Sequence, residues 1–130
     1  MTYELVINQQ LPSYNEYINA CRSHWSKGAK FKKDIDRIIG YEILRAKSEK
    51  KLAPTSVPCV INIEWHEKTK KRDADNIQSA QKFILDALQL TEIIPNDSRR
   101  YVKQIYHEII DDTKDYVRVL ISEIHGKETK

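Results

Sequence analysis

The spacing of apolar residues changes several times along the chain, and each change predicts a new element of secondary structure. Runs rich in β-branched and aromatic residues predict strands at 3–7, 57–65, 101–110 and 116–124. Apolar residues at helical spacing predict helices at 14–24, 31–50 and 77–90. Ser13 and Glu16 have the spacing of a capping box at the start of the first helix. The predicted order of elements is β-α-α-β-α-β-β.

Glycine, proline and short polar runs predict how these elements connect. Gly28 predicts a break between the first two helices, and the proline-containing segment 50–58 predicts a loop before the second strand. The polar segment 111–115 predicts a turn that joins the last two strands as a hairpin. The connection between the second and third strands is long enough for a crossover, so part of the sheet is expected to be parallel. We expect one small α+β domain over residues 1–130, with a mixed four-stranded sheet and helices packed on one face.

The composition agrees with one core beneath a heavily charged surface. Apolar residues make up 40% of the 130 residues and charged residues 32%, which argues against a disordered or fibrous chain. No stretch approaches the roughly 18 apolar residues of a membrane helix. No secretory signal is visible at the start, and Cys21 and Cys59 lie far apart without metal-ligand spacing. We expect two reduced, partly buried thiols in a cytoplasmic protein, with a disulfide as the alternative.

Positive charge is concentrated in three places, although the net charge is only +3. The clusters are Lys27, Lys30, Lys32, Lys33 and Arg37; Lys68, Lys70, Lys71 and Arg72; and Arg99, Arg100 and Lys103. Clusters of this kind can neutralise the phosphates of a nucleic acid, or they can be ordinary solvated faces. Charge alone does not decide between these interpretations.

Asp73 and Asp75 are the residues that point most directly to chemistry. Side chains at i and i+2 of an extended segment point the same way, so both carboxylates can meet one cation. Magnesium prefers such oxygen ligands and keeps room for water and phosphate. The alternative is structural, because Asp and Asn often cap the start of a helix. Asn76 can likewise be a capping residue or order the outer hydration shell of a metal.

Lys82 and Asp97 are further candidates with structural alternatives of their own. If the third helix includes Asp75, then Asp75, Ser79, Lys82 and Asp86 share one of its faces. Lys82 can stabilise charge on a phosphodiester, or it can form a surface ion pair with Asp86. Asp97 lies in a polar turn just before the third cluster of positive charge, where it needs no function.

Other types of catalytic site find no support in the sequence. The histidines lack zinc-ligand spacing and are interpreted as surface or strand residues: His24, His66, His107 and His125. Three glycines in the whole chain make a glycine-rich phosphate loop implausible. Asp111, Asp112 and Asp115 are interpreted as residues of the turn between the last two strands.

Several segments, in order, resemble the RusA family of crossover-junction endodeoxyribonucleases, especially its phage and prophage members. The segments are LPSYNEYI at 11–18, GAKFKK at 28–33, RDADN at 72–76, KFILDAL at 82–88 and IPND at 94–97. The resemblance covers most of the chain, from residue 11 to residue 119. In the type enzyme the lysine follows the aspartate–asparagine pair about three residues sooner, close to one helical turn.

The resemblance implies an enzyme that resolves four-way (Holliday) junctions by paired symmetric hydrolysis, in recombination, repair or prophage DNA processing. It implies Mg²⁺, with Mn²⁺ as a substitute, held by Asp73, Asp75 and Asp97, and a catalytic Lys82. It also implies a small α+β fold and a homodimer, whose two-fold symmetry suits a four-way junction. The residues expected to contact DNA are Lys30, Lys32, Lys33, Lys70, Lys71, Arg72, Asn76, Arg99 and Arg100.

Two other functions remain open from the sequence. A non-catalytic protein that binds branched DNA would use the same clusters of positive charge, although acids on a phosphate-contacting surface weaken such binding. A metal-dependent hydrolase of small phosphate esters would use the same acids, although the basic clusters then lack a purpose. No membrane partner is expected.

Overall fold

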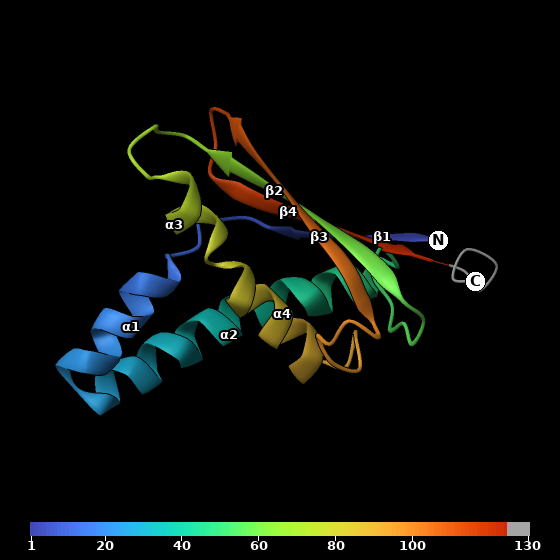
Figure 1. The fold of residues 1–130 in the computed structure, drawn as a ribbon, viewed down its shortest axis with the longest axis horizontal. Helices are drawn as coiled ribbons and strands as arrows, with labels where there is room; N and C mark the ends of the chain where they lie inside the picture. The colour runs from blue at the N-terminus through green and yellow to red at the C-terminus, as the bar shows by residue number, and fades with distance from the viewer. Residues whose placement is uncertain (125–130) are drawn as a thin grey trace.

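The computed structural model describes residues 1–124, and His125 and the rest of the polar end, 125–130, lie outside the described residues (Figure 1). The strands are β1 (Thr2–Ile7), β2 (Cys59–Glu67), β3 (Val102–Asp111) and β4 (Tyr116–Glu123). The helices are α1 (Tyr14–Ser23), α2 (Trp25–Ser48), α3 (Ala74–Gln78) and α4 (Gln81–Leu90). The predicted α+β class is confirmed, with all helices on one face of the sheet.

The four strands form one mixed sheet in the order β1-β4-β2-β3. β2 pairs with β3 in parallel and with β4 antiparallel, so the predicted crossover through the third helical segment is confirmed. Every second residue of β2 from Cys59 to Trp65 is buried beneath the helices. This placement puts β2, a strongly apolar strand, inside the sheet with a partner on each edge.

The predicted hairpin between the last two strands is wrong. β4 inserts between β1 and β2, and the polar turn passes over the C-terminal end of β2 to reach it. The Asp112 N–H donates to the Glu67 carbonyl (3.0 Å), and the Lys68 N–H donates to the Asp115 carboxylate (2.7 Å). A short polar segment can either close a hairpin or cross over a neighbouring strand, and its composition does not distinguish the two. The crossing seen here gives both edges of β2 a partner.

The predicted break at Gly28 is also wrong, because Gly28 lies buried inside α2. The chain turns instead at His24, which ends α1 and begins α2. A Cβ atom at Gly28 would lie 2.5 Å from the Cys21 sulfur and 2.9 Å from the Cys21 Cα. Glycine therefore serves close packing of α1 against α2 at this position.

The predicted helix at 77–90 begins earlier and is divided in two. Ser79 and Ala80 separate α3 from α4, with i to i+3 bonds from Lys82 N–H to the Ser79 carbonyl and from Phe83 N–H to the Ala80 carbonyl. Asp73 occupies the N-cap position of α3, but its side chain makes no capping hydrogen bond. The structural alternative is thus met in position, because Asp73 stands at the start of α3, but not in side-chain hydrogen bonding.

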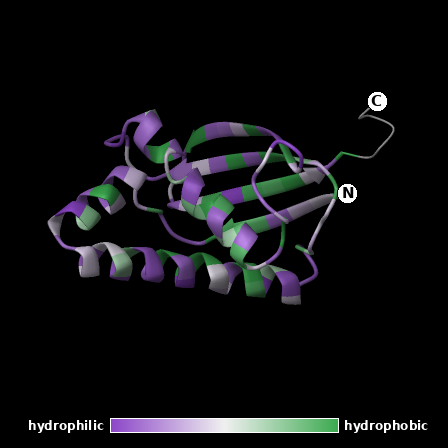
Figure 2. Ribbon diagram, turned by 60° about the horizontal axis from the view of Figure 1, so that its bottom comes forward, coloured by the Kyte–Doolittle hydropathy of each residue, from purple (hydrophilic) through white to green (hydrophobic). Residues whose placement is uncertain are grey.

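The core lies between the helices and the sheet, where apolar residues of both layers face each other (Figure 2). Phe83 of α4 is fully buried and its ring contacts aromatic rings of α1 and α2. Its ring centre lies 5.4 Å from Tyr14, 5.9 Å from Tyr17 and 6.5 Å from Phe31. This aromatic cluster fixes α1 and α2 to the helix that carries Lys82.

Both cysteines are free thiols, which agrees with the predicted reduced state. Two partly buried thiols were expected. Instead Cys59 is buried in β2 and Cys21 is exposed. Among the described residues, none of the helices combines the length and the apolar character needed to cross a bilayer.

Candidate active site

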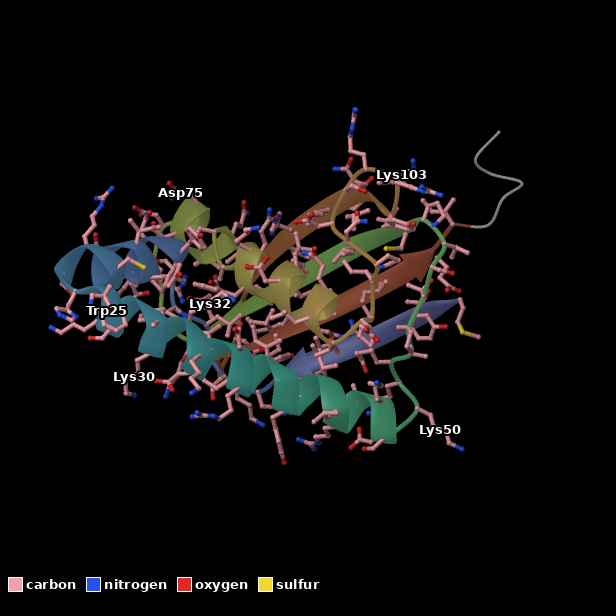
Figure 3. The ribbon with its side chains drawn as sticks, turned by 90° about the horizontal axis from the view of Figure 1, so that it is seen from below. Trp25, Lys30, Lys32, Lys50, Asp75 and Lys103 are labelled. Atoms are coloured by element: carbon pink, nitrogen blue, oxygen red, sulfur yellow. The ribbon has the colours of Figure 1, made fainter. Side chains whose placement is uncertain are left out.

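The helix that carries Asp75 follows the C-terminal end of β2 and is fixed to the first turn of α1. The Tyr14 N–H donates to the Ser79 hydroxyl (2.9 Å), which itself donates to the Asn76 carbonyl (2.7 Å). The Asn15 amide donates to the Asn76 side-chain oxygen (2.9 Å). Asn76, an expected DNA contact, is thus half-buried and bonded to α1. These bonds hold Asp75 in a defined place at the surface, where Figure 3 labels it.

Asp75 and Lys82 both line one open depression of about 370 Å³. The remaining residues that line it are Tyr14, Gln78, Ser79, Gln81 and His107. The two candidates therefore come together although Ser79 and Ala80 interrupt the helix between them. The helical-face argument from the sequence holds approximately, because the two interrupting residues keep helical dihedral angles.

Lys82 also forms the ion pair that was its structural alternative. Its ammonium lies 3.2 Å from the Asp86 carboxylate, and half of the side chain is exposed. The hydrogen bond and the charge of Asp86 raise the pKa of Lys82, and the charges of Asp97 and Tyr14 act in the same direction. Lys82 is therefore held in its charged form, with one flank still open to a ligand.

Asp97 is exposed in the loop between α4 and β3, and its charge reaches Lys82. In the described part of the chain, no group of three or more His, Cys, Asp or Glu side chains is placed to hold one metal ion. The structure thus places Asp75 beside Lys82 but does not draw Asp73, Asp75 and Asp97 onto one point.

The chemistry of these three carboxylates still fits a hard divalent cation. Four other aspartates form ion pairs with lysine or arginine: Asp34, Asp36, Asp86 and Asp111. Asp112 is bonded to His66, and Asp115 accepts the Lys68 N–H. Within residues 1–124, Asp73, Asp75 and Asp97 form no ion pair, and all three are exposed. Exposed carboxylate oxygens without a cationic partner are the ligands that Mg²⁺ or Mn²⁺ takes in proteins.

Glu67 and Arg72 form a pair that the sequence did not reveal. Glu67 is only 5% exposed at the end of β2, where it accepts a hydrogen bond from Gln10 (3.2 Å) and lies 3.7 Å from the Arg72 guanidinium. Burial raises the pKa of Glu67, and the charge of Arg72 opposes this effect. Arg72, expected to contact DNA, is therefore directed at Glu67 and fixes the end of the loop that precedes Asp73.

The other expected DNA contacts divide into paired and unpaired cations. Lys30 pairs with Asp34 (3.1 Å), and Lys70 lies 3.7 Å from Asp111. Lys32 pairs with Asp36 (2.8 Å) and approaches Asp86 (3.8 Å), while the Arg100 guanidinium lies over the Tyr101 ring at 5.5 Å. Among these expected contacts, the exposed side chains to which residues 1–124 offer no ion pair or hydrogen bond are Lys33, Lys71 and Arg99. Of the expected contacts, these three are the most available to phosphates.

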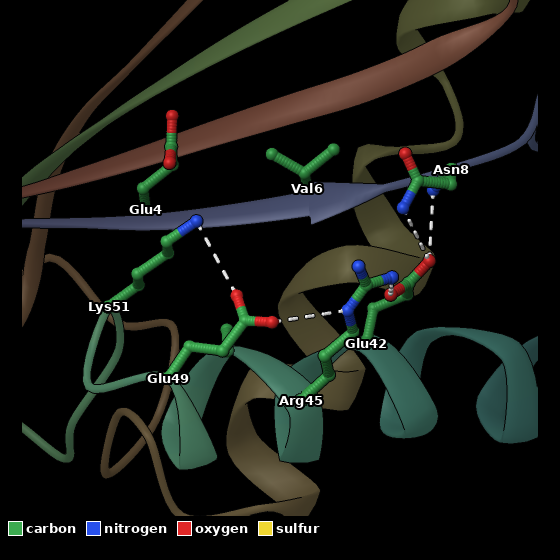
Figure 4. Close-up of a pocket in the computed structure, with 8 residues that line it drawn as sticks. Glu4, Val6, Asn8, Glu42, Arg45, Glu49 and Lys51 are labelled. Atoms are coloured by element: carbon green, nitrogen blue, oxygen red, sulfur yellow. Dashed lines mark hydrogen bonds and ion pairs between the residues drawn. The ribbon is translucent and has the colours of Figure 1, made fainter.

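Another hollow, of about 230 Å³, lies between β1 and the C-terminal half of α2, and most of its charged side chains pair with one another (Figure 4). Glu42 accepts hydrogen bonds from the backbone and side chain of Asn8 and lies 3.8 Å from Arg45. Glu49 pairs with Arg45 and Lys51, both at 3.4 Å. These contacts fix α2 to the edge of the sheet, so the hollow is interpreted as structural.

His107, which lines the depression, is held by hydrogen bonds on both ring nitrogens. The Trp65 indole N–H donates to His107 Nδ1 (2.9 Å), so the ring proton lies on Nε2, which donates to the Gln81 side-chain oxygen (2.8 Å). The two rings also stack, with centres 6.0 Å apart. Burial lowers the pKa of His107, so the imidazole is neutral in the folded protein. This chain of bonds positions Gln81, the neighbour of Lys82.

We expect His107 to make the protein less stable in mild acid. Its folded pKa lies below the unfolded value of about 6.5, so the unfolded chain binds the proton more readily as the pH falls through that value. The contribution of His107 to stability is fully present above about pH 6.5, and it is lost as the pH falls from there to the folded pKa. Melting temperatures of wild type and His107→Gln between pH 5 and pH 8 test this. The melting temperature of the variant should fall less than that of wild type between pH 7 and pH 5. Equal falls would contradict a neutral, buried His107.

Comparison with known proteins adds no family to this description: no protein-family model matches the chain, and no curated protein matches it. Function is therefore inferred from the residues of the chain and their geometry. The features that carry this inference are the depression shared by Asp75 and Lys82, and the unpaired state of Asp73 and Asp97.

Proposed function

We propose that the protein is a metal-dependent endonuclease that cuts branched DNA, with the four-way junction as its preferred substrate. The observation that carries the proposal is the open depression in which an unpaired carboxylate, Asp75, faces the same solvent space as the charged Lys82. The resemblance to the RusA family adds the class of substrate. The lack of ion pairs at Asp73 and Asp97 supports a site that binds a cation.

In this proposal each residue has a role that follows from its chemistry. Asp73, Asp75 and Asp97 would hold the metal, which when bound polarises a phosphodiester and lowers the pKa of a water molecule. Lys82 would donate hydrogen bonds to a phosphate oxygen and stabilise negative charge there. The ion pair with Asp86 keeps that lysine charged and limits the directions in which its side chain extends.

Phosphates of the arms would be held by exposed cations with no partner in residues 1–124: Lys33, Lys71 and Arg99. Contacts of this type depend on salt and are largely independent of sequence. Arg72 would act through Glu67, as a positioning residue for the loop that carries Asp73. A second copy of the chain would supply the second nick, because a two-fold dimer matches the symmetry of the junction.

Cleavage of an end-labelled synthetic four-way junction tests the proposal. With Mg²⁺ or Mn²⁺ we expect paired nicks at symmetric positions, no product after chelation, and little cutting of a duplex of equal length. Binding of the junction without cutting in either metal would overturn the proposal and identify a branched-DNA binding protein. Turnover of a chromogenic phosphodiester with an intact junction would instead indicate a hydrolase of small phosphate esters.

A further inference from the structure

Trp25 is the most exposed large apolar side chain described in the structure, with 78% of its surface open to solvent. It lies at the turn between α1 and α2 and is stacked against His24, with ring centres 5.8 Å apart and planes 28° apart. His24 Nδ1 accepts the Ser26 backbone N–H (3.1 Å), which caps α2 and fixes the imidazole. The indole is thus an exposed aromatic surface beside a ring of fixed orientation, and it contributes little to the core.

All charged residues in the segment around Trp25 are basic. No acidic residue lies between Glu16 and Asp34. We call residues 22–33 the hairpin tip; its ionisable cations and histidine are Arg22, His24, Lys27, Lys30, Lys32 and Lys33. Within residues 1–124, Arg22, Lys27 and Lys33 form no ion pair. Lys33 lies eight residues after Trp25, about 12 Å along α2 and about 80° around its axis.

The hairpin tip is connected to the candidate active site by α1. The first turn of α1 is hydrogen-bonded to α3, and the ten residues of α1 then extend about 15 Å to the turn. Figure 1 shows the α1–α2 hairpin projecting beyond the sheet on the side of α3, and Figure 3 labels Trp25 and Lys30 at its end. At about 3.4 Å per base pair, 15 Å corresponds to about four steps of duplex DNA.

We propose that the hairpin tip is a second DNA-binding element, in which Trp25 stacks on an unpaired base while Arg22, Lys27 and Lys33 hold neighbouring phosphates. The inference rests on the proposed function, because a branch point supplies bases that lack a stacking neighbour. Stacking on an aromatic ring beside a basic groove is how proteins hold single-stranded nucleic acid. A bilayer surface is the less favoured partner, because Trp25 is the only exposed large apolar side chain of residues 22–33.

Substitutions at the tip separate stacking from charge. Trp25→Ala should weaken binding to a four-way junction and to a single strand of thymidines by about 5- to 150-fold, with an unchanged dependence on salt. Trp25→Phe should keep most of the affinity. Lys33→Gln should lower the slope of log affinity against log salt by about 0.7 to 0.9. Tyr41→Ala is the matched control, because it removes an aromatic residue that is 65% exposed on α2 outside the tip, and it should change nothing.

Tryptophan fluorescence gives a direct second readout. The only other tryptophan, Trp65, is buried in β2, so the difference between wild type and Trp25→Phe isolates the signal of Trp25. Stacking on a base should quench that signal when single-stranded DNA is added. A shift of the Trp25 emission to shorter wavelength with vesicles that contain phosphatidylglycerol, without quenching by DNA, would overturn the proposal in favour of a membrane contact.

The outcomes distinguish this inference from the proposed function. If wild-type protein cuts junctions and Trp25→Ala binds and cuts them equally well, the tip inference is overturned and the nuclease stands. If no junction is cut but binding depends on Trp25, the nuclease is overturned and the tip inference stands. If wild-type protein binds neither junction nor single strand, both are overturned. Circular dichroism of each variant checks folding, which should be unaffected because Trp25 is exposed.

Discussion

Replacing Asp75 by Asn is expected to lower the rate of junction cleavage by at least about a hundredfold while junction affinity changes little. Groups that only support metal ligands already cost about 10- to 100-fold when removed, so loss of a ligand itself should cost at least the upper value. Asn keeps the shape of the side chain and can still accept the Asn76 N–H, which bonds to the Asp75 carboxylate at 3.0 Å. The charge that attracts the metal is lost, whereas the cations that hold the arms remain.

Rates of single-turnover cleavage, measured with increasing Mn²⁺, check this expectation. Asp111→Asn is the matched control, because it makes the same chemical change at an exposed carboxylate that lies 3.7 Å from Lys70. The control should cut within about twofold of wild type, as expected for a surface substitution away from the reacting atoms. Mn²⁺ should also raise the melting temperature of wild type and control, but not of Asp75→Asn. If Asp75→Asn cuts at the wild-type rate, Asp75 is not a ligand of the catalytic metal.

Local features of the sequence predicted the elements well, because each depends on neighbouring residues. The capping box is present, with the Glu16 N–H bonded to the Ser13 hydroxyl (3.2 Å) and the Ser13 N–H bonded to the Glu16 carboxylate (2.7 Å). The strands alternate as expected, and β2 extends by two residues beyond the predicted end to include Glu67. Helical spacing likewise predicted that Asp75 and Lys82 share one face, and both residues line one depression.

Features that depend on distant residues were not predictable from these patterns. The turn at 111–115 has the composition of a hairpin turn, and only the pairing of both edges of β2 sends β4 to the far side of β2 from β3. The buried pair of Glu67 and Arg72 joins a strand end to a loop. Alternation continued to residue 67 would have placed Glu67 on the buried face, but the predicted strand ended at residue 65 and no local pattern joins Glu67 to Arg72. The bond between His107 and Gln81 joins β3 to α4 across 26 positions of sequence.

The positioning of the candidate site therefore comes from contacts between elements, while its chemistry comes from one short segment. Asp75 directly precedes Asn76, which α1 holds through Asn15, and Asp73 lies three residues before Asn76. The same helix α1 leads to Trp25, so the packing of α1 against α2 sets the distance between the candidate active site and the hairpin tip. At Gly28 the two helices approach so closely that a Cβ atom would lie 2.9 Å from the Cys21 Cα.

Replacing Gly28 by Ala should destabilise the protein by about 1–3 kcal/mol, although alanine is the better helix former. The new methyl group would lie 2.5 Å from the Cys21 sulfur and 2.9 Å from the Cys21 Cα. The sulfur can move by rotation of its side chain, but the Cα moves only if α1 itself shifts away from α2. Chemical denaturation with circular dichroism measures the loss, and a shifted α1 should also weaken the Trp25-dependent binding of single-stranded DNA.

Gly40→Ala in the same helix is the control that isolates packing from helix propensity. A Cβ atom at Gly40 meets no atom within 4 Å, and neither glycine has a positive φ. This substitution should therefore stabilise the protein by about 0.5–1 kcal/mol, because alanine lowers the entropy of the unfolded chain. In a Cys21→Ala background, Gly28→Ala should recover only part of its loss, because the contact with the Cα remains. Stabilisation by Gly28→Ala equal to that of Gly40→Ala would show that α1 and α2 pack less closely than 2.9 Å implies.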